Sequence, residues 1–344
     1  MSVIRIFGLF LSLLIFLFLI VRLRKYKSKI KVDPLMLFVL GGSLFIISIY
    51  PAILNRPTDF FLSDNLQGAR IILLLIFSNI LLWFFLLSER GKLFRLKQSF
   101  NKNLIYSMIN LKTHKIKKQK NIIIIIPAFN EEKNLNYLLS RFKKRILGFK
   151  IDILVIDDGG YDNTKKICTK HKVFYSRCPI NMGGGFATNV GFAFALRYNY
   201  DFFITMDADG QHLPEDISAF IKKFSKHDFV IGSRILGQME MYSKLRYFGV
   251  ILFGKLISFL IGQKLTDPAS GFRGGKTKLL KKLQLTQEQY HTSEFIIKSS
   301  KHNLNITEVP IFIKKRYSGS SKKGKNIYYS LMFLKTIIKS FFFK

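Results

Sequence analysis

Residues 121–132 read NIIIIIPAFNEE, and this stretch decides the fold. The run of five isoleucines is β-branched throughout and too short for a helix, and Pro127 ends it. A short run that is apolar at every position is typical of a central strand in a parallel sheet, where helices cover both faces. Asn130 can then cap a helix, with Glu131 and Glu132 in its first turn. The stretch therefore predicts a strand followed by a helix.

The same alternation continues along the chain. The apolar face expected for the first helix consists of Leu135, Leu138, Leu139, Phe142 and Ile146, which recur at helical spacing. We expect further strands at Ile153–Ile156, Phe202–Met206 and Phe229–Gly232, and helices near Asn163–Lys170, after Gly183–Gly185 and near Pro214–Ser225. Alternating strands and helices predict an α/β fold with a layered sheet.

Acidic residues follow three of these strands, in PAFNEE at 127–132, DDGG at 157–160 and DADGQH at 207–212. Ligands of such sheets bind beyond the carboxyl ends of the strands. Asp207, Asp209 and Gln211 offer oxygen ligands, which suit Mg²⁺ or Mn²⁺ held through one or two carboxylates and substrate phosphates. A solvated turn is the alternative for a lone Asp-x-Asp, but acidic groups at three strand ends favour a metal site.

A glycine-rich stretch, NMGGG at 181–185, precedes an apolar helix. Its backbone amides can approach a bound anion at the helix N-terminus. A flexible turn remains the alternative, because no Walker Lys-Ser/Thr pair follows the glycines.

Seven motifs between residues 122 and 322 carry a family resemblance: PAFNEE, VIDDGGYDNT, NMGGGFATNVGFA, MDADGQH, IGSR, DPASGFR and EVPIFIKKRYSGSSK. In this order they resemble the family 2 glycosyltransferases of GT-A fold, a Rossmann-like mixed sheet with flanking helices. They look most like the dolichyl- and polyprenyl-phosphate sugar transferases. The resemblance implies an inverting enzyme that moves a sugar from a nucleotide sugar to a polyprenyl phosphate, with Mg²⁺ or Mn²⁺ as cofactor.

The resemblance also implies roles for single residues. The nucleotide sugar would meet Pro127, Asn130, Glu131, Asp157, Asp158, Gly183, Asp207 and Ala208, and the metal would be held by Asp207, Asp209 and Gln211. The lipid phosphate would meet Arg234, Arg316, Ser321 and Lys322, and the catalytic residues would be Asp209, Arg234 and Asp267. Two positions depart from the family pattern: Gly160 stands where Ser is usual, and Gly184 where Lys is frequent.

Three uncharged apolar runs open the chain, at Ile6–Val21, Pro34–Leu54 and Ile71–Ser88. Each approaches the ~20 residues that a membrane-spanning helix needs. Basic residues are concentrated in the first loop and in the segment after the third run, which predicts an integral membrane protein of three spans, with its N-terminus outside and everything after Ser88 in the cytoplasm. This region also resembles a small, uncharacterised three-helix membrane family.

We therefore expect an all-α transmembrane domain of three helices at residues 1–90 and a basic juxtamembrane linker at 91–120. The glycosyltransferase domain would occupy residues 121–322, and a basic amphipathic tail at 323–344 would lie on the membrane surface. A further helix at Leu245–Ile261, with Lys255 at its middle, would lie in the membrane interface, with a buried helix of the domain as the alternative. The membrane helices also offer a surface for oligomerisation.

The chain carries 55 Lys and Arg against 21 Asp and Glu, a net charge of +34, which favours anionic partners such as membrane lipids. Nucleic acid is not expected, because the aromatic residues lie in apolar runs and form no basic stacking platform. With Cys168 and Cys178 as the only cysteines, a disulfide framework and a cysteine-rich metal site are excluded.

Other functions stay open at this point. A hydroxyl of a lipid-linked sugar could be the acceptor, in which case Asp267 or Glu294 would serve as the base. A catalytically silent sugar-binding scaffold is a further possibility. A processive polysaccharide synthase is disfavoured, because such enzymes carry a Gln-x-x-Arg-Trp motif and the only tryptophan here is Trp83, in the third apolar run.

Overall fold

The computed structural model describes residues 3–25, 32–50, 69–109, 121–240, 244–283, 285, 291–302, 304–319, 333–338 and 340–341. The chain divides into two compact units, Met1–Lys102 and Asn103–Lys344.

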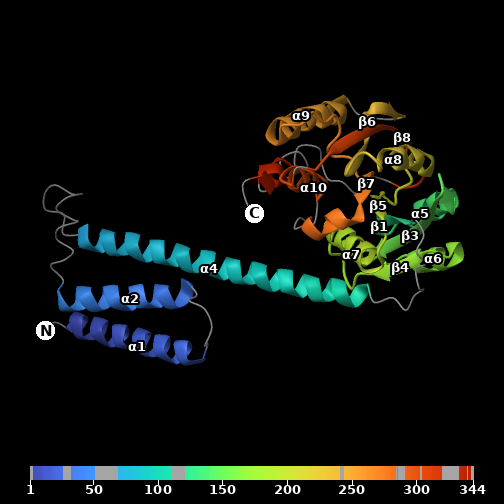
Figure 1. The fold of residues 1–344 in the computed structure, drawn as a ribbon. Helices are drawn as coiled ribbons and strands as arrows, with labels where there is room; N and C mark the ends of the chain where they lie inside the picture. The colour runs from blue at the N-terminus through green and yellow to red at the C-terminus, as the bar shows by residue number, and fades with distance from the viewer. Residues whose placement is uncertain are drawn as a thin grey trace. The chain divides into compact units, whose positions relative to one another are not determined.

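The first unit is helical. It consists of α1 (Val3–Lys25), α2 (Val32–Ile49) and most of α4 (Ala69–Met108), as labelled in Figure 1. Helices α1 and α2 pack closely, with Ser12 Oγ donating a hydrogen bond to the carbonyl of Gly41 at 2.9 Å and Phe16 in edge contact with Phe38. A Cβ atom on Gly41 would come within 3.2 Å of the Ile15 side chain, so glycine permits this approach.

Among the described residues, no helix has both the length and the apolar composition required to cross a bilayer. The three-span domain predicted from the sequence is therefore not supported by these helices. Helix α4 also runs without a break across residue 90, where we expected the domain boundary.

The second unit is built around a mixed sheet. Its strands are β1 (Asn121–Ala128), β2 (Arg145–Ile146), β3 (Phe149–Asp157), β4 (Phe174–Arg177), β5 (Phe202–Thr205), β6 (Phe229–Met239), β7 (Arg273–Lys276) and β8 (Ile306–Ile313). Its helices are α5 (Glu132–Leu139), α6 (Thr164–His171), α7 (Gly184–Arg197), α8 (Ile217–Lys223), α9 (Lys244–Ile261) and α10 (His291–Ser300), with 3₁₀ turns η2 (Pro214–Asp216) and η3 (Thr277–Lys282).

The strand order is β2-β3-β1-β5-β7-β6-β8, with β4 also paired to β3. Figure 1 shows this order from β8 and β6 at one edge to β3 and β4 at the other. Strands β1, β3, β4 and β5 are mutually parallel, whereas β7 is antiparallel to both β5 and β6. The carboxyl ends of β1, β3, β5 and β6 therefore share one edge of the sheet.

The isoleucine run forms the centre of this sheet, as predicted. All five isoleucines are fully buried. Because side chains alternate along a strand, Ile123 and Ile125 join the core that contains α7 and α10 residues, and Ile122, Ile124 and Ile126 join the core that contains α5 and α8 residues. The helices thus cover both faces of β1, which is why the run carries no polar residue.

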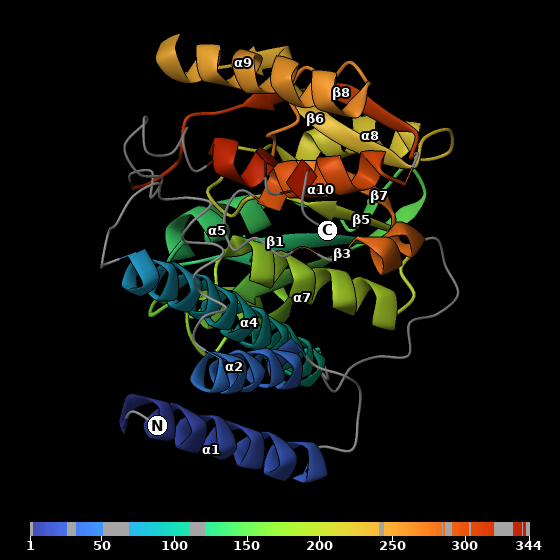
Figure 2. The ribbon, with the colours of Figure 1, turned by 90° about the vertical axis from the view of Figure 1, so that its left-hand side faces the viewer.

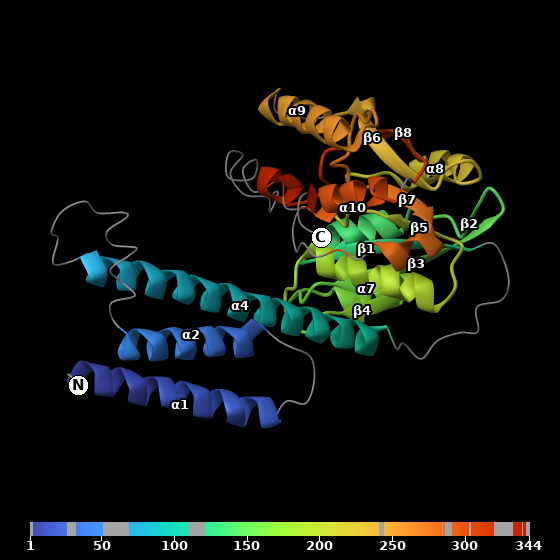
Figure 3. The same cartoon turned by 60° about the vertical axis from the view of Figure 1, so that its left-hand side comes forward.

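Helix α9 lies beside β6 and β8, as Figure 2 and Figure 3 both show. Its buried residue Ile257 belongs to the same core as α7 and α10. Phe333, in the described part of the predicted surface tail, packs against Phe253 of α9 at a ring distance of 4.9 Å, and Ile337 is fully buried. Both side chains of the tail belong to the core that contains α7 and α10 residues.

One helix prediction was wrong in its length. Helix α5 ends at Leu139, and Ile146 belongs to β2, which pairs with β3 in a tight hairpin. The hairpin turns at Leu147 and Gly148, both with positive φ, so the last apolar position assigned to the helix, Ile146, lies in an edge strand.

Candidate active site

A cleft of about 380 Å³ lies at the carboxyl edge of the sheet. Its walls come from the segments after β1, β5 and β8, from α7 and α10, and from the turn that enters β7. The lining side chains include Pro127, Phe129, Glu131, Gly184, Thr188, Phe192, Asp207, Ala208, Asp209, Gln211, Gly271, Arg273, Thr292, Phe295, Arg316 and Gly319. The parallel course of β1 and β5 brings the first and third predicted acidic segments together, as expected.

The three predicted metal ligands all line this cleft. Asp209 Oδ1 accepts a hydrogen bond from the backbone N–H of Gln211 at 3.2 Å. The Gln211 amide nitrogen donates to the carbonyl of Lys314 at 3.1 Å, which leaves the amide oxygen on the opposite side of that group. Two carboxylates and an amide oxygen are the hard donors that Mg²⁺ and Mn²⁺ take.

Within the described ranges, no three His, Cys, Asp or Glu side chains gather into a metal site of their own. An ion held by Asp207, Asp209 and Gln211 would therefore complete its coordination with water or with phosphate oxygens of a substrate, as Mg²⁺ commonly does. With water or phosphate oxygens as the remaining ligands, Asp207, Asp209 and Gln211 fit the predicted ion.

Arg316, which follows β8, reaches into the same cleft. Its guanidinium group donates a hydrogen bond to Glu131 and lies 3.7 Å from Asp209 Oδ2. Glu131 also accepts a hydrogen bond from Asn134 at 2.6 Å. A positive group thus lies between acidic side chains that follow two different strands.

The segment that carries Arg316 is fastened to α5. Asn134 and Ser318 exchange two hydrogen bonds, of 3.0 and 2.8 Å, and the rings of Tyr137 and Tyr317 stack in parallel with centroids 4.5 Å apart. We call residues 314–319 the strap. The strap forms one wall of the cleft, and its position fixes where the Arg316 guanidinium lies.

The second acidic segment has a different role. Asp157 accepts hydrogen bonds from the N–H of Gly160 and the hydroxyl of Tyr175, and Asp158 accepts from the N–H groups of Met182 and Gly183. Neither carboxylate lines the cleft. Burial raises the pKa of Asp158, although the two backbone hydrogen bonds favour its ionised form. Asp158 thus holds the glycine-rich turn, and a contact between these two carboxylates and the nucleotide stays a prediction.

Two other residues predicted to bind the nucleotide also hold loops. Asn130, with φ of 53°, accepts a hydrogen bond from the N–H of Tyr161 at 2.8 Å. Gly183, with φ of 87°, precedes α7 and gives its N–H to Asp158. A Cβ atom on Gly160 would lie 2.9 Å from both Asn130 Oδ1 and Asp157 Oδ1. The glycine at position 160, where Ser is usual in the family, therefore allows the Asn130 and Asp157 side chains to approach the backbone closely.

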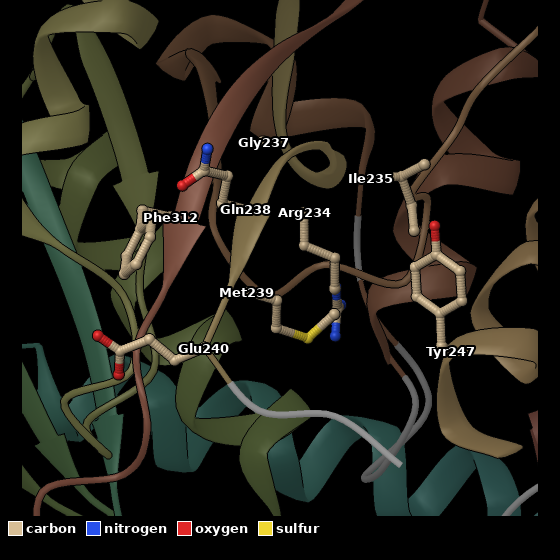
Figure 4. Close-up of a pocket in the computed structure, with 8 residues that line it drawn as sticks. All are labelled: Arg234, Ile235, Gly237, Gln238, Met239, Glu240, Tyr247 and Phe312. Carbon is tan, nitrogen blue, oxygen red and sulfur yellow. The ribbon is translucent and has the colours of Figure 1, made fainter. Parts of the chain in front are cut away.

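Arg234 lies in a second pocket, of about 480 Å³, lined by Arg234, Ile235, Gly237, Gln238, Met239, Glu240, Tyr247 and Phe312. Figure 4 shows the Arg234 and Met239 side chains extending toward each other, with Tyr247 of α9 opposite them. The sequence gives no sign that Arg234 lies in a pocket separate from the cleft that contains the acidic residues. Ser321 and Lys322, predicted to act with Arg234, lie outside the described residues.

The two candidate bases are both buried and paired. Asp267 is 0% exposed and forms a two-point ion pair with Arg234, with contacts of 2.5 and 3.2 Å. Glu294 is 1% exposed and pairs with Lys298 at 2.7 Å. Neither lines the cleft, and each carboxylate is engaged by a neighbouring cation.

Arg273 was missed as a site residue, although it ends the quoted motif DPASGFR. Its guanidinium group is buried at the cleft wall and donates to the carbonyls of Ser270, Thr292 and Pro268. It thereby joins the turn before β7 to the start of α10. Burial lowers the pKa of Arg273. A lone arginine at a strand start gives no sequence signal for this role.

The family model for Glycosyl transferase family 2 matches residues 123–284. An uncharacterised protein of Methanocaldococcus jannaschii is 38% identical over 226 residues, which cover 63% of this chain and 90% of that protein. The UDP-N-acetylglucosamine–dolichyl-phosphate N-acetylglucosaminyltransferase of Methanococcus voltae is 34% identical over 251 residues, or 63% of this chain and 96% of that protein.

The fold has a counterpart among solved structures. The glucosyl-3-phosphoglycerate synthase of Mycobacterium tuberculosis, crystallised with Mn²⁺ and uridine diphosphate, superposes with a TM-score of 0.52 at 15% identity, over 67% of this chain and 86% of that one. At this identity the likeness concerns the fold alone, a mixed α/β sheet with flanking helices. From the family match and the two archaeal relatives, the chain belongs to the family 2 glycosyltransferases.

Proposed function

We propose that the protein transfers a sugar from a nucleotide sugar to the phosphate of a polyprenyl lipid, with inversion at the anomeric carbon and with Mg²⁺ or Mn²⁺ as cofactor. One observation carries the proposal: Asp207, Asp209 and Gln211 line the same cleft as Glu131 and Arg316. The names of two relatives support the acceptor, since one is a dolichyl-phosphate N-acetylglucosaminyltransferase and another is the polyprenol monophosphomannose synthase of Mycolicibacterium smegmatis.

In the proposed reaction a phosphate oxygen of the lipid attacks the anomeric carbon of the sugar. The bond between that carbon and the diphosphate oxygen breaks, and the nucleoside diphosphate leaves with the electron pair. A divalent ion held by Asp207, Asp209 and Gln211 would neutralise charge on the leaving diphosphate. Arg316, in the same cleft, would stabilise that charge from the side of the strap.

The state of the two candidate bases favours a phosphate acceptor over a sugar hydroxyl. A lipid phosphate is already ionised near neutral pH, so its attack needs no strong base, whereas a hydroxyl must lose its proton during the reaction. Asp267 forms an ion pair with Arg234, and Glu294 forms one with Lys298. Both carboxylates are buried, and neither lines the cleft. The alternative of a hydroxyl acceptor is therefore the weaker one.

The second pocket is the proposed site of the lipid phosphate. Arg234 supplies a cation there, and Tyr247 places the start of α9 beside it. Phe248, Leu252 and Phe259 are exposed on α9, along with Lys255, which gives the apolar and basic surface expected of a helix at a membrane interface. This arrangement would let a lipid chain stay in the bilayer while its phosphate enters the protein. Cytoplasmic placement of this unit remains a prediction.

The test supplies the protein with polyprenyl phosphate and a panel of radiolabelled UDP- and GDP-sugars, in Mn²⁺, Mg²⁺ or chelator. We expect label in the organic phase only when a divalent ion is present, and its loss in Asp209→Ala. Asp228→Ala is the matched control, because Asp228 precedes β6 at the opposite edge of the sheet, paired with Lys276.

Two results would contradict the proposal. If a lipid-linked sugar is supplied together with polyprenyl phosphate, label that passes to the sugar in preference to the phosphate would establish the hydroxyl acceptor. Binding of a nucleotide sugar without any turnover, under all ion conditions, would favour the silent scaffold.

A further inference from the structure

Glu308, on β8, holds the start of the turn that leads into β7. Its Oε1 atom accepts a hydrogen bond from the N–H of Asp267 at 2.8 Å. Its Oε2 atom accepts from the N–H of Thr266 at 2.8 Å and from the Thr266 hydroxyl at 2.9 Å. Two backbone donors and one hydroxyl thus converge on a single half-buried carboxylate, which fixes residues 266 and 267 against β8.

The first of two connections from Glu308 to Arg234 runs through hydroxyl groups. Because Thr266 gives its hydroxyl proton to Glu308, the Ser233 hydroxyl is the donor in the 2.6 Å contact between Ser233 and Thr266. Ser233 Oγ in turn accepts the N–H groups of residues 235 and 236, both at 3.2 Å. The backbone on either side of Arg234 is therefore tied to Glu308 through a chain of hydrogen bonds with a defined direction.

The second connection runs through Asp267. Glu308 holds the Asp267 backbone, and the Asp267 carboxylate accepts hydrogen bonds from the backbone N–H, Nε and Nη2 of Arg234. The carboxylate is fully buried, so no water competes for these contacts. A displacement of residue 267 would rotate the guanidinium group that lines the second pocket.

We propose that Glu308 is a positioning residue for Arg234. It orients the guanidinium group from both sides, through Ser233 on the backbone and through Asp267 on the side chain, without lining the pocket itself. The inference rests on the proposed function, in which Arg234 meets the phosphate of the lipid acceptor. Its consequence is selective: loss of the Glu308 carboxylate should impair use of the acceptor and leave use of the nucleotide sugar intact.

Glu308→Gln tests this in the full chain, because the amide keeps the size of the side chain but turns an NH₂ group toward N–H donors. We expect the KM for polyprenyl phosphate to rise about tenfold, with the KM for the nucleotide sugar and its slow hydrolysis in the absence of acceptor unchanged. Asp201→Asn is the matched control, since Asp201 accepts a backbone N–H from Asn121 at 2.9 Å, just before β5 and far from the turn.

A double-mutant cycle separates positioning from a general structural role. In an Arg234→Ala background, Glu308→Gln should add no further rise in the acceptor KM, because the group that it positions is gone. Additive effects, or equal rises in both KM values, would overturn the inference. If Glu308→Gln does not fold, Thr266→Val removes only the hydroxyl link, and an unchanged acceptor KM in that variant would overturn it as well.

The wild-type assay distinguishes failure of the proposed function from failure of the role proposed for Glu308. Wild-type protein that makes no lipid product would overturn the proposed function and this inference with it. Wild-type transfer combined with a normal acceptor KM in Glu308→Gln would overturn the inference alone.

Discussion

The guanidinium group of Arg316 lies 3.7 Å from the Oδ2 atom of Asp209. The same group is hydrogen bonded to Glu131, so it links acidic residues that follow β1 and β5. In our proposal Asp209 is a metal ligand, and Arg316 is therefore a cation that competes for the same carboxylate. Binding of an ion would require Arg316 to release Asp209, and the strap that carries Arg316 would have to adjust.

Replacement of Arg316 by glutamine should tighten the binding of Mn²⁺ in the absence of nucleotide. A partly exposed ion pair contributes about 0.5–1 kcal/mol, so we expect a gain of roughly two- to fivefold in affinity. Calorimetric titration with Mn²⁺ measures it. Lys315→Gln removes the same charge from the strap at an exposed position and should change the affinity less. Weaker Mn²⁺ binding in Arg316→Gln would mean that the guanidinium supports the ion instead.

Gly271 lies directly against the first carboxylate of the acidic pair. A Cβ atom at this position would come within 2.8 Å of Asp207 Oδ1 and would displace that carboxylate. Gly271→Ala should therefore reduce turnover by roughly ten- to hundredfold. Because the displaced group is the end of a side chain, the melting temperature should change little. Gly249→Ala is the control, since nothing lies within 4 Å of a Cβ atom there. Full activity in Gly271→Ala would argue against a role for Asp207.

The exposed side of α9 can be probed in the intact protein with a fluorescent label. Cys168 and Cys178 are both buried, and burial raises the pKa of Cys168 to about 12, so a new exposed cysteine should be labelled selectively. With an environment-sensitive dye on Phe259→Cys, anionic vesicles should shift the emission to shorter wavelength. The same dye on Tyr161→Cys, also highly exposed, should not respond. Equal responses at both positions would contradict an interfacial α9.

Asp158 should give the protein a measurable pH dependence of stability. Burial raises the pKa of this carboxyl in the folded chain, so its contribution to stability is present below the unfolded pKa and is lost as the pH rises through the folded value. The melting temperature of the wild type relative to Asp158→Asn should therefore fall as the pH rises above about 4.

Asp228→Asn provides a control of opposite sign for this experiment. The hydrogen bond from Lys276 lowers the pKa of Asp228, so its contribution is present at high pH and is lost as the pH falls. The wild type relative to Asp228→Asn should thus lose stability as the pH falls below about 4 and should change little above that pH. If the wild-type melting temperature changed with pH in the same direction relative to both variants, the Asp158 carboxyl would not have the raised pKa that its burial predicts.

The central part of the fold could be predicted because its sequence signals are local. The isoleucine run, the strand at Phe202–Thr205 and the acidic residues after them follow from β-branched composition and from the rule that parallel strands end at one edge. The hairpin at Leu147 and Gly148 was missed because a helical spacing of apolar residues continued across it, and backbone conformation decided the outcome.

The acidic residues of the site could be predicted from the sequence. The separation of the cleft from the pocket that contains Arg234 could not. The sequence marks Asp207 and Asp209 by their spacing, but it gives no measure of the distance to Arg234, which depends on a bulge in β6 and on the pairing with Asp267. The structural roles of Asp157 and Asp158 were likewise hidden, because the same motif can bind a ligand or close a loop.

The antiparallel course of β7 has a consequence for how this enzyme can diversify. Since β7 runs against its neighbours β5 and β6, the loop that enters it arrives at the functional edge, and this one loop touches Asp207 through Gly271 and Arg234 through Asp267. In our proposal, an insertion or a change of shape in that loop would therefore alter the binding of both substrates. Among homologues that differ in this loop, we expect the sugar preference and the lipid preference to change together.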